Sequence, residues 1–177
     1  LMDASRKRAL PTLPLCIGLV TSPRGAAVHD VLRTLRRRYP LARIVFAGVP
    51  VEGATAADVL SQAIKLVAAS DAEVILLVRG GGSFEDLMPF NDENLARTIA
   101  SCPKPIVTGI GHEPDTSIAD MVADMRASTP TGAAEAVSPQ REDLNELLQS
   151  QANRLSSSLI HRLNRSRVFI DGIASRP

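Results

Sequence analysis

The first candidate for chemistry is a glycine-rich loop that follows an apolar run. Val74–Val78 is followed directly by Arg79, three glycines and Ser83. Glycine has no Cβ, so a ligand can approach the peptide N–H groups closely, and successive N–H groups in such a loop form an anion-binding concavity. A guanidinium at the exit of a buried strand needs a carboxylate or a phosphate as its partner. A tight strand-to-helix turn would account for the glycines, but Arg79 favours an anion site.

A histidine and two aspartates are the candidates for acid–base chemistry. His112 and Asp115 lie three residues apart after another apolar run, and histidine is the usual proton carrier near neutral pH. Asp115 could orient the imidazole, bind a metal ion or activate water. Asp30 lies near the start of a predicted helix, where an acid is equally well explained as a partner of the helix dipole.

Other acids near these residues have simpler explanations. The segment 83–86 could extend the anion site, but we favour a helix N-cap with Glu85 and Asp86 in the first turn. Asp120 and Asp124 have no distinctive spacing, so we expect solvent exposure or local pairing for both. Asp120 could nevertheless face the site.

The hydrophobic pattern predicts the elements that position these residues. Strand-like apolar runs alternate with segments of helical period, which indicates right-handed βαβ units and a parallel sheet. The predicted strands are 16–20, 43–47, 73–78 and 105–109, and the predicted helices end near 38, 69, 101 and 125. After the last of these helices, we expect a polar loop over 126–132. The fold class is therefore α/β, with three layers and a parallel sheet of four or five strands.

Ligands of such sheets bind beyond the carboxyl ends of the strands. Thr21–Ser22, the Arg79 loop and the segment 112–115 each follow a predicted strand, so we expect them to converge on an anion-sized hollow. An arginine, glycine amides, a histidine and acids at one edge suit phosphate-ester chemistry. The arginine and amides would hold the phosphate, the histidine would move a proton, and an aspartate would position water or a metal ion. Spacing alone does not separate a hydrolase from a nucleotide-binding module.

Composition narrows the possible partners. The 177 residues are 45% hydrophobic and 22% charged, as in soluble globular proteins, and the 3% aromatic content argues against a base-stacking platform. The net charge is only +1, but cations gather in residues 1–40 and 151–177, which suits either a polyanion or a solvated basic surface.

Cys16 and Cys102 lack metal-type spacing, so we expect buried free thiols in a reducing compartment. We find no signal peptide and no apolar run of membrane-spanning length.

Three regions are expected along the chain. Residues 1–14 are basic and contain Pro11 and Pro14, which predicts an extended linker. Residues 15–137 would form the α/β domain. Residues 138–177 are helical with an apolar seam that needs a partner, which predicts one long helix that begins a coiled-coil arm. The helical pattern is unfinished at the last residue, so we expect a piece of a longer protein.

Five segments together resemble the large subunit of exodeoxyribonuclease VII. Two of them read Val78-Arg-Gly-Gly-Gly-Ser-Phe-Glu-Asp-Leu87 and Gly109-Ile-Gly-His-Glu-Pro-Asp-Thr-Ser-Ile-Ala-Asp120, and the others span 17–30, 89–91 and 123–131 in matching order. The resemblance implies a single-strand-specific DNA exonuclease that works from both ends and releases oligonucleotides. It also implies an N-terminal OB-type domain before this segment, and a helical region that recruits copies of a small helical subunit.

The resemblance carries the family's functional positions over to residues of this chain. The catalytic positions fall on Asp30, Arg79, His112 and Asp115. The residues that we expect to contact phosphate or DNA are Thr21, Ser22, Gly80, Gly81, Gly82 and Ser83. Members differ in their need for a divalent ion, so Mg2+ held by Asp30 and Asp115 is an expectation only. Arg24 and the pair 88–89 depart from the family pattern without touching the proposed chemistry.

Two alternatives to the nuclease remain at this point. One is a nucleoside-monophosphate N-glycosidase, although such loops usually read Pro-Gly-Gly-x-Gly-Thr rather than Arg-Gly-Gly-Gly-Ser. The other is a non-catalytic assembly scaffold in which the long helix is the working part. We expect a cytoplasmic protein, and we expect that this segment alone could be inactive without the OB-type domain and the small subunit.

Overall fold

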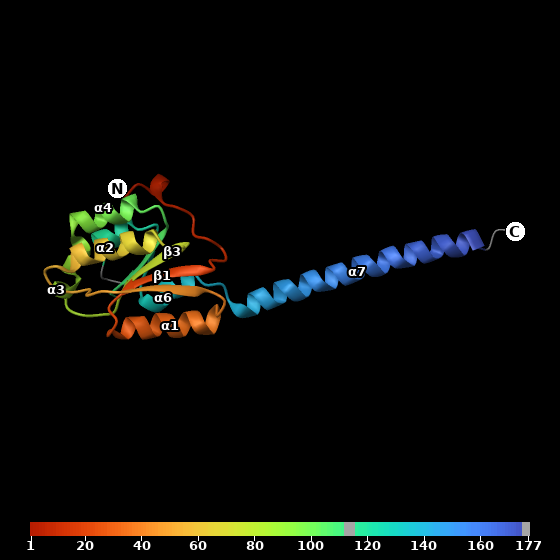
Figure 1. Ribbon diagram of the computed structural model, residues 1–177, viewed down its shortest axis with the longest axis horizontal. Coiled ribbons are helices and arrows are strands. Elements are labelled where there is room, and N and C mark those ends of the chain that lie inside the picture. Colours follow the sequence, from red (N-terminus) through yellow and green to blue (C-terminus); the bar gives the residue numbers. More distant parts are fainter. Residues whose placement is uncertain (112–115, 175–177) are drawn as a thin grey trace. The chain divides into compact units, whose positions relative to one another are not determined.

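The computed structural model describes residues 1–111 and 116–174 (Figure 1). The chain forms two compact units, Leu1–Pro139 and Gln140–Pro177. No helix in the described ranges is both long and apolar enough to cross a membrane.

A five-stranded sheet forms the centre of the first unit. Its spatial order is β2-β1-β3-β4-β5, and every neighbouring pair is parallel. The strands are β1 (Cys16–Thr21), β2 (Arg43–Gly48), β3 (Val74–Arg79), β4 (Ile106–Ile110) and β5 (Met125–Ala127). The three central strands are buried along their whole length, as expected where helices cover both faces of a parallel sheet. The predicted α/β class is therefore confirmed.

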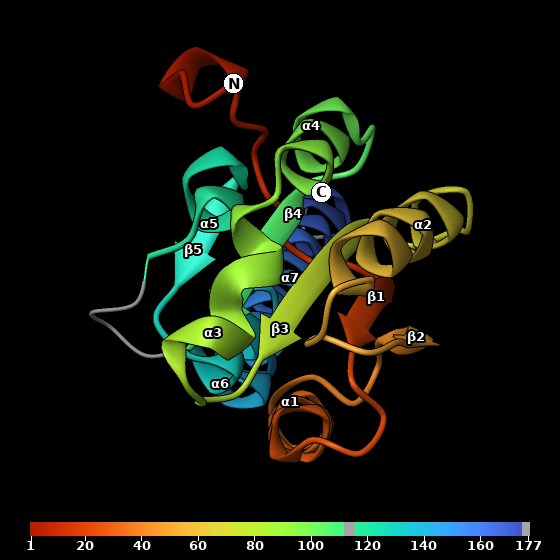
Figure 2. The same cartoon turned by 90° about the vertical axis from the view of Figure 1, so that its left-hand side faces the viewer.

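Helices cover the two faces of this sheet and complete three layers (Figure 2). On one face, α1 (Ala26–Arg38) and α6 (Pro130–Ala136) pack on Ile17, Leu19 and Leu76. The other face is covered by α2 (Ala56–Ala68), α4 (Glu93–Ser101) and α5 (Ile118–Val122). Two short elements, α3 (Phe84–Leu87) and η2 (Met88–Asn91), follow β3, and η1 (Ala4–Arg6) lies near the N-terminus.

The segment after β4 differs from its prediction. The predicted helix over 116–125 ends at Val122, and the chain then forms β5, the fifth strand of the sheet. The polar loop expected over 126–132 is also wrong, because α6 begins at Pro130. The Thr129 hydroxyl caps this helix by accepting a hydrogen bond from the Gly132 N–H at 3.0 Å, with proline at the first helical position.

Tight packing of α6 on β4 explains why this helix forms there. A Cβ at Gly109 would lie 2.7 Å from the Thr129 carbonyl oxygen and 2.9 Å from the Ala133 Cβ. Glycine in β4 therefore lets the start of α6 approach the sheet backbone. The small residues of this short helix then complete the apolar layer on the face of the sheet that α1 also covers.

An aspartate fastens the N-terminal segment to the amino ends of the strands. The side chain of Asp124 is 2% exposed, so the expectation of solvent exposure is wrong. One carboxylate oxygen accepts hydrogen bonds from the N–H and Nε of Arg8 at 2.7 and 3.0 Å, and the other accepts one from the Ile106 N–H at 2.7 Å. Within residues 1–14, Leu10 also packs against the core.

The second unit consists mainly of the 34-residue helix α7 (Arg141–Ala174). The predicted long helix is confirmed, although it begins three residues later than expected. Large apolar side chains along it are exposed rather than buried: Leu147, Leu148, Leu155, Leu159, Ile160, Leu163, Val168 and Ile170. An amphipathic helix with an uncovered apolar seam depends on a partner for much of its stability.

Candidate functional site

A buried arginine stands at the carboxyl edge of the sheet. Arg79 is the last residue of β3, and its side chain is only 6% exposed. Its Nη2 lies 3.1 Å from Asp86 Oδ2 and 3.7 Å from Glu52 Oε2. The guanidinium has thus found carboxylate partners, one just after the glycine loop and one before α2. Partners of this kind are required because an isolated buried charge is very unfavourable.

Asp86 is fixed by the start of the next helix. The Ser83 N–H donates to Asp86 Oδ2 at 2.9 Å, and the two residues form a capping box at α3. Hydrogen bonding by Ser83, first through its backbone N–H, lowers the pKa of Asp86, and the nearby Arg79 guanidinium lowers it further. The helix-cap interpretation of Asp86 is confirmed. The capping hydrogen bond also engages the Ser83 amide, so this N–H is already used within the protein.

The glycine loop lies directly against the guanidinium. A Cβ added at Gly82 would fall 2.7 Å from Arg79 Cζ, closer than real Cβ contacts. At the other end of the loop, a Cβ at Gly80 would make ordinary contact with Ala27 at the start of α1. Glycine at position 82 therefore leaves the room that the arginine head occupies.

One nitrogen of the guanidinium remains unused. Arg79 Nη1 is buried and has no hydrogen-bond partner within the described ranges. A buried donor without a partner is unfavourable by roughly 1–3 kcal/mol, so such groups call for an explanation. A bound anion at the glycine loop would supply the missing acceptor.

The other predicted site residues near this edge make no hydrogen bond or ion pair with the Arg79 side chain among the described residues. Thr21 ends β1, the strand beside β3, and is buried, while the adjacent Ser22 is partly exposed. The side chain of Asp30, in α1, is 49% exposed and lies 3.8 Å from Arg33. In the described part of the chain, no hydrogen bond or ion pair joins Asp30 to Arg79. The start of α1 nevertheless borders the glycine loop, through the Ala27 contact at Gly80.

His112 and Asp115 lie outside the described residues, and their roles stay predictions. The residue that precedes them, Gly111, is buried and has a φ of +67°, which favours glycine. Its N–H donates to the carbonyl oxygen of Arg79 at 3.2 Å. The end of β4 is therefore hydrogen-bonded to the residue that carries the guanidinium.

Asn91 and Glu52 were not anticipated as site residues, whereas Asp120 was expected to be exposed or paired locally. Asp120 is 2% exposed, and its Oδ2 accepts from the Ser117 N–H at 3.0 Å and hydroxyl at 2.7 Å, so local pairing is confirmed. Its Oδ1 is buried without a hydrogen-bond partner in the described residues. The Asn91 side chain accepts from the Ile118 N–H at 2.9 Å. The Ser117–Asp120 spacing of a capping box was a usable signal, whereas nothing in the spacing links Glu52 to Arg79.

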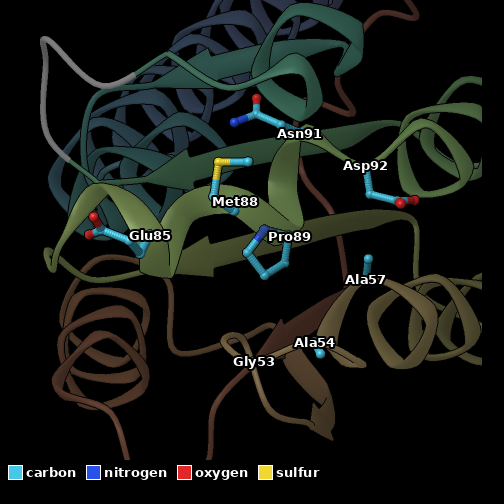
Figure 3. Close-up of a pocket in the computed structure, with 8 residues that line it drawn as sticks. All are labelled: Gly53, Ala54, Ala57, Glu85, Met88, Pro89, Asn91 and Asp92. Carbon is cyan, nitrogen blue, oxygen red and sulfur yellow. The ribbon is translucent and has the colours of Figure 1, made fainter.

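A groove borders the carboxylates that hold Arg79. It has a volume of about 510 Å³, and Gly53 and Glu85, the chain neighbours of Glu52 and Asp86, are among the residues that line it. Figure 3 shows Met88 and Pro89 on the η2 side, with Ala54 and Ala57 on the α2 side. Small and apolar walls with acids at the margin do not suit a phosphate, so this groove is not the candidate anion site.

The described residues give no metal centre and no reactive thiol. In residues 1–111 and 116–174, no group of three or more His, Cys, Asp or Glu side chains could hold a metal ion. Both cysteines are buried and free, as predicted. Burial raises the pKa of the Cys102 thiol, which keeps it protonated and unreactive.

Comparisons with known proteins identify the family. Residues 1–176 match the family described as "Exonuclease VII, large subunit". Relatives named "Exodeoxyribonuclease 7 large subunit" include those of Desulforudis audaxviator, 47% identical over 100% of this chain and 44% of the relative, and of Ralstonia nicotianae, 49% identical over 99% and 40%. The relative from Legionella pneumophila strain Corby is 47% identical over 99% of this chain and 41% of its own.

The chain thus spans less than half the length of these relatives. Neither the N-glycosidase nor the scaffold alternative finds support among them. The match covers all five segments on which the resemblance was based. The chain belongs to the exonuclease VII large-subunit family.

Proposed function

We propose that the first unit is the hydrolytic domain of an exodeoxyribonuclease that cuts single-stranded DNA from both ends and releases oligonucleotides. The observation that carries this proposal is the buried Arg79 head beside a glycine loop at the carboxyl edge of a parallel sheet, with no partner for Nη1 among the described residues. The names of the relatives support the reaction class. Single-strand specificity and cleavage from both ends rest on the family resemblance.

Arg79 is the phosphate-binding group in this proposal. Nη1 would donate to a non-bridging oxygen of the scissile phosphate, and the amides of Gly80, Gly81 and Gly82 would donate to the others. These donors are held in place before the substrate arrives, so they stabilise charge that develops on the phosphate without reorganisation. Thr21 and Ser22, at the end of the neighbouring strand, would contact the adjoining part of the DNA.

His112 is proposed to move the proton. In the reaction, water adds to phosphorus, the bond from phosphorus to one sugar oxygen breaks, and that oxygen takes up a proton. His112 would act as the general acid or base, and Asp30 and Asp115 would align the attacking water. The support for these roles is the residue types and the family positions on which they fall.

A divalent ion is a separate proposal. Asp30 and Asp115 would be its ligands, and Mg2+ would neutralise phosphate charge and polarise water. Asp30 pairs with Arg33 instead, and the described ranges contain no cluster of metal-binding side chains. The described residues do not by themselves form a metal site, and the hydrolytic roles proposed for Arg79 and His112 do not depend on one.

The partners and location are also proposals. We propose that α7 is the first part of an arm that binds copies of a small helical subunit, which the exposed apolar side chains along it support. We propose a cytoplasmic location for the complex. Two buried free cysteines are compatible with a reducing compartment.

The test is turnover by the full-length large subunit assembled with its small subunit. Arg79→Ala, His112→Ala and Asp115→Ala should each lower the release of fragments from an end-labelled single-stranded oligonucleotide by about 100-fold or more. Arg97→Ala is a matched control, because Arg97 is exposed and pairs with Glu93 on α4. Near-normal turnover in all three site variants would overturn the proposal, and release of free base from a nucleoside monophosphate would favour the glycosidase.

A further inference from the structure

The two carboxylates that contact Arg79 differ in how firmly they are held. Asp86 lies 3.1 Å from Nη2, and its carboxylate also accepts a hydrogen bond from the Ser83 N–H at 2.9 Å. Glu52 lies 3.7 Å from the same nitrogen, and its side chain is 65% exposed. Within the described ranges, Glu52 has no other ion pair or hydrogen bond. One partner is therefore anchored, and the other is a loose contact from a separate part of the chain.

Among the described residues, the carboxylate partners of the guanidinium contact only one of its two terminal nitrogens. Nη2 faces both carboxylates, whereas Nη1 is buried and has no partner in the described part of the chain. Arginine binds phosphate best through two parallel N–H donors. A phosphate that used both nitrogens would meet an acid already on Nη2, and two anions on the same donor repel each other.

We propose that Asp86 is a positioning residue that holds the Arg79 guanidinium in place. We propose that Glu52 occupies the place of a DNA phosphate on Arg79 until DNA binds and displaces it. This inference rests on the proposed function of Arg79. Asp86 keeps the guanidinium against Gly82 whether or not DNA is bound. Glu52 covers Nη2 in the free protein and moves into solvent when a phosphate oxygen takes its place.

The two acids should therefore affect different kinetic parameters. Glu52 competes with the substrate for Nη2, so Glu52→Gln lowers KM, by about two- to fivefold for an exposed pair of this length. Asp86 holds the donor that acts in the transition state, so Asp86→Asn lowers kcat, by roughly tenfold or more. The asparagine can still accept from the Ser83 N–H, which preserves the cap of α3, while the negative charge beside Arg79 is lost.

The experiment measures kcat and KM of the full-length large subunit with its small subunit on an end-labelled single-stranded oligonucleotide. Each variant is also made in an Arg79→Lys background, because effects that act through Arg79 disappear when the guanidinium fork is absent. Glu93→Gln is the matched control, since Glu93 makes an exposed ion pair with Arg97 on α4. Thermal unfolding of each variant reports whether Asp86→Asn still folds. If it does not fold, the KM of Glu52→Gln, with and without Arg79→Lys, tests the inference by itself.

The expected result is a lower KM for Glu52→Gln, a lower kcat for Asp86→Asn, and neither effect beside Arg79→Lys. Effects of the same sign on the same parameter, effects that persist beside Arg79→Lys, or values equal to those of Glu93→Gln would overturn the inference. Near-normal turnover of Arg79→Ala together with His112→Ala and Asp115→Ala would overturn the proposed function. If Arg79→Ala is inactive while both acid variants match the control, only this inference fails.

Discussion

The two edges of the sheet use charged residues in opposite ways. At the amino edge, Asp124 accepts hydrogen bonds from Arg8 and Ile106, and Glu73 accepts from the N–H groups of Leu15 and Cys16. At the carboxyl edge, Arg79 Nη1 and Asp120 Oδ1 are buried without partners in the described residues. Polar groups at the first edge are satisfied by the protein itself, whereas these two atoms at the second edge have no partner in the described residues. We therefore expect substitutions at the amino edge to change stability and those at the carboxyl edge to change activity.

The largest stability effect should come from Asp124→Ala. The change leaves the buried Ile106 N–H and the Arg8 side chain without their acceptor, which should lower the free energy of unfolding by about 3 kcal/mol. Urea unfolding of the chain measures this loss. The activity of the complex per folded molecule should stay the same, and a selective loss of turnover would remove the distinction between the edges.

Gly82→Ala should have the next largest effect, now on activity. The added Cβ would crowd Arg79 Cζ, and the arginine head would have to move away from Asp86. We expect roughly tenfold lower turnover with a small change in unfolding free energy, because misplaced donors lose much of their effect. Gly25→Ala is a suitable control, since its Cβ would make only ordinary contacts. Unchanged turnover in Gly82→Ala would show that the guanidinium need not stay against the loop.

How far the sequence predicts this fold depends on how the apolar residues are arranged. Strands β1, β3 and β4 are continuous buried runs between turn residues, so they could be located closely. Strand β5 could not, because it has only three residues, none of them buried, and no apolar run of its own. Its neighbour α6 depends on the missing side chain of Gly109, a contact that no local pattern shows.

The candidate site was predictable to a similar degree. Arg79 follows from its place at the end of an apolar run, and the Asp86 cap follows from its spacing to Ser83. The contact of Glu52 with Arg79 joins the loop before α2 to the end of β3, so only the folded sheet reveals it. The burial of Asp120 arises in the same way, from packing of α5 rather than from its own neighbours in sequence.

A smaller stability effect is expected from Glu73→Ala at the amino edge. Its carboxylate receives the Leu15 and Cys16 N–H groups at 2.8 and 3.3 Å, but it is exposed, so water can replace much of what is lost. We expect about 1 kcal/mol lower unfolding free energy and normal turnover. Urea unfolding beside Asp124→Ala gives the comparison. If Glu73→Ala lowered the unfolding free energy as much as Asp124→Ala, burial of the carboxylate would not determine how much each contributes to stability.

The smallest expected effect is a loss of stability at low pH that comes from protonation of Asp86. Its pKa is lowered from the ordinary 3.8 in the folded state, so its stabilising effect is complete above that value and is lost as pH falls through the lower folded pKa. The difference in urea midpoint between the native chain and Asp86→Asn should therefore shrink as the pH drops below about 4. A difference that widens towards low pH would contradict the assigned direction.

The most direct test is a structure of the full-length complex bound to a single-stranded phosphorothioate oligonucleotide that resists cleavage. We predict a phosphate oxygen about 2.9 Å from Arg79 Nη1, with Asp86 still on Nη2 and Glu52 displaced. A phosphate bound elsewhere, with both carboxylates still on the guanidinium and Nη1 empty, would contradict the account.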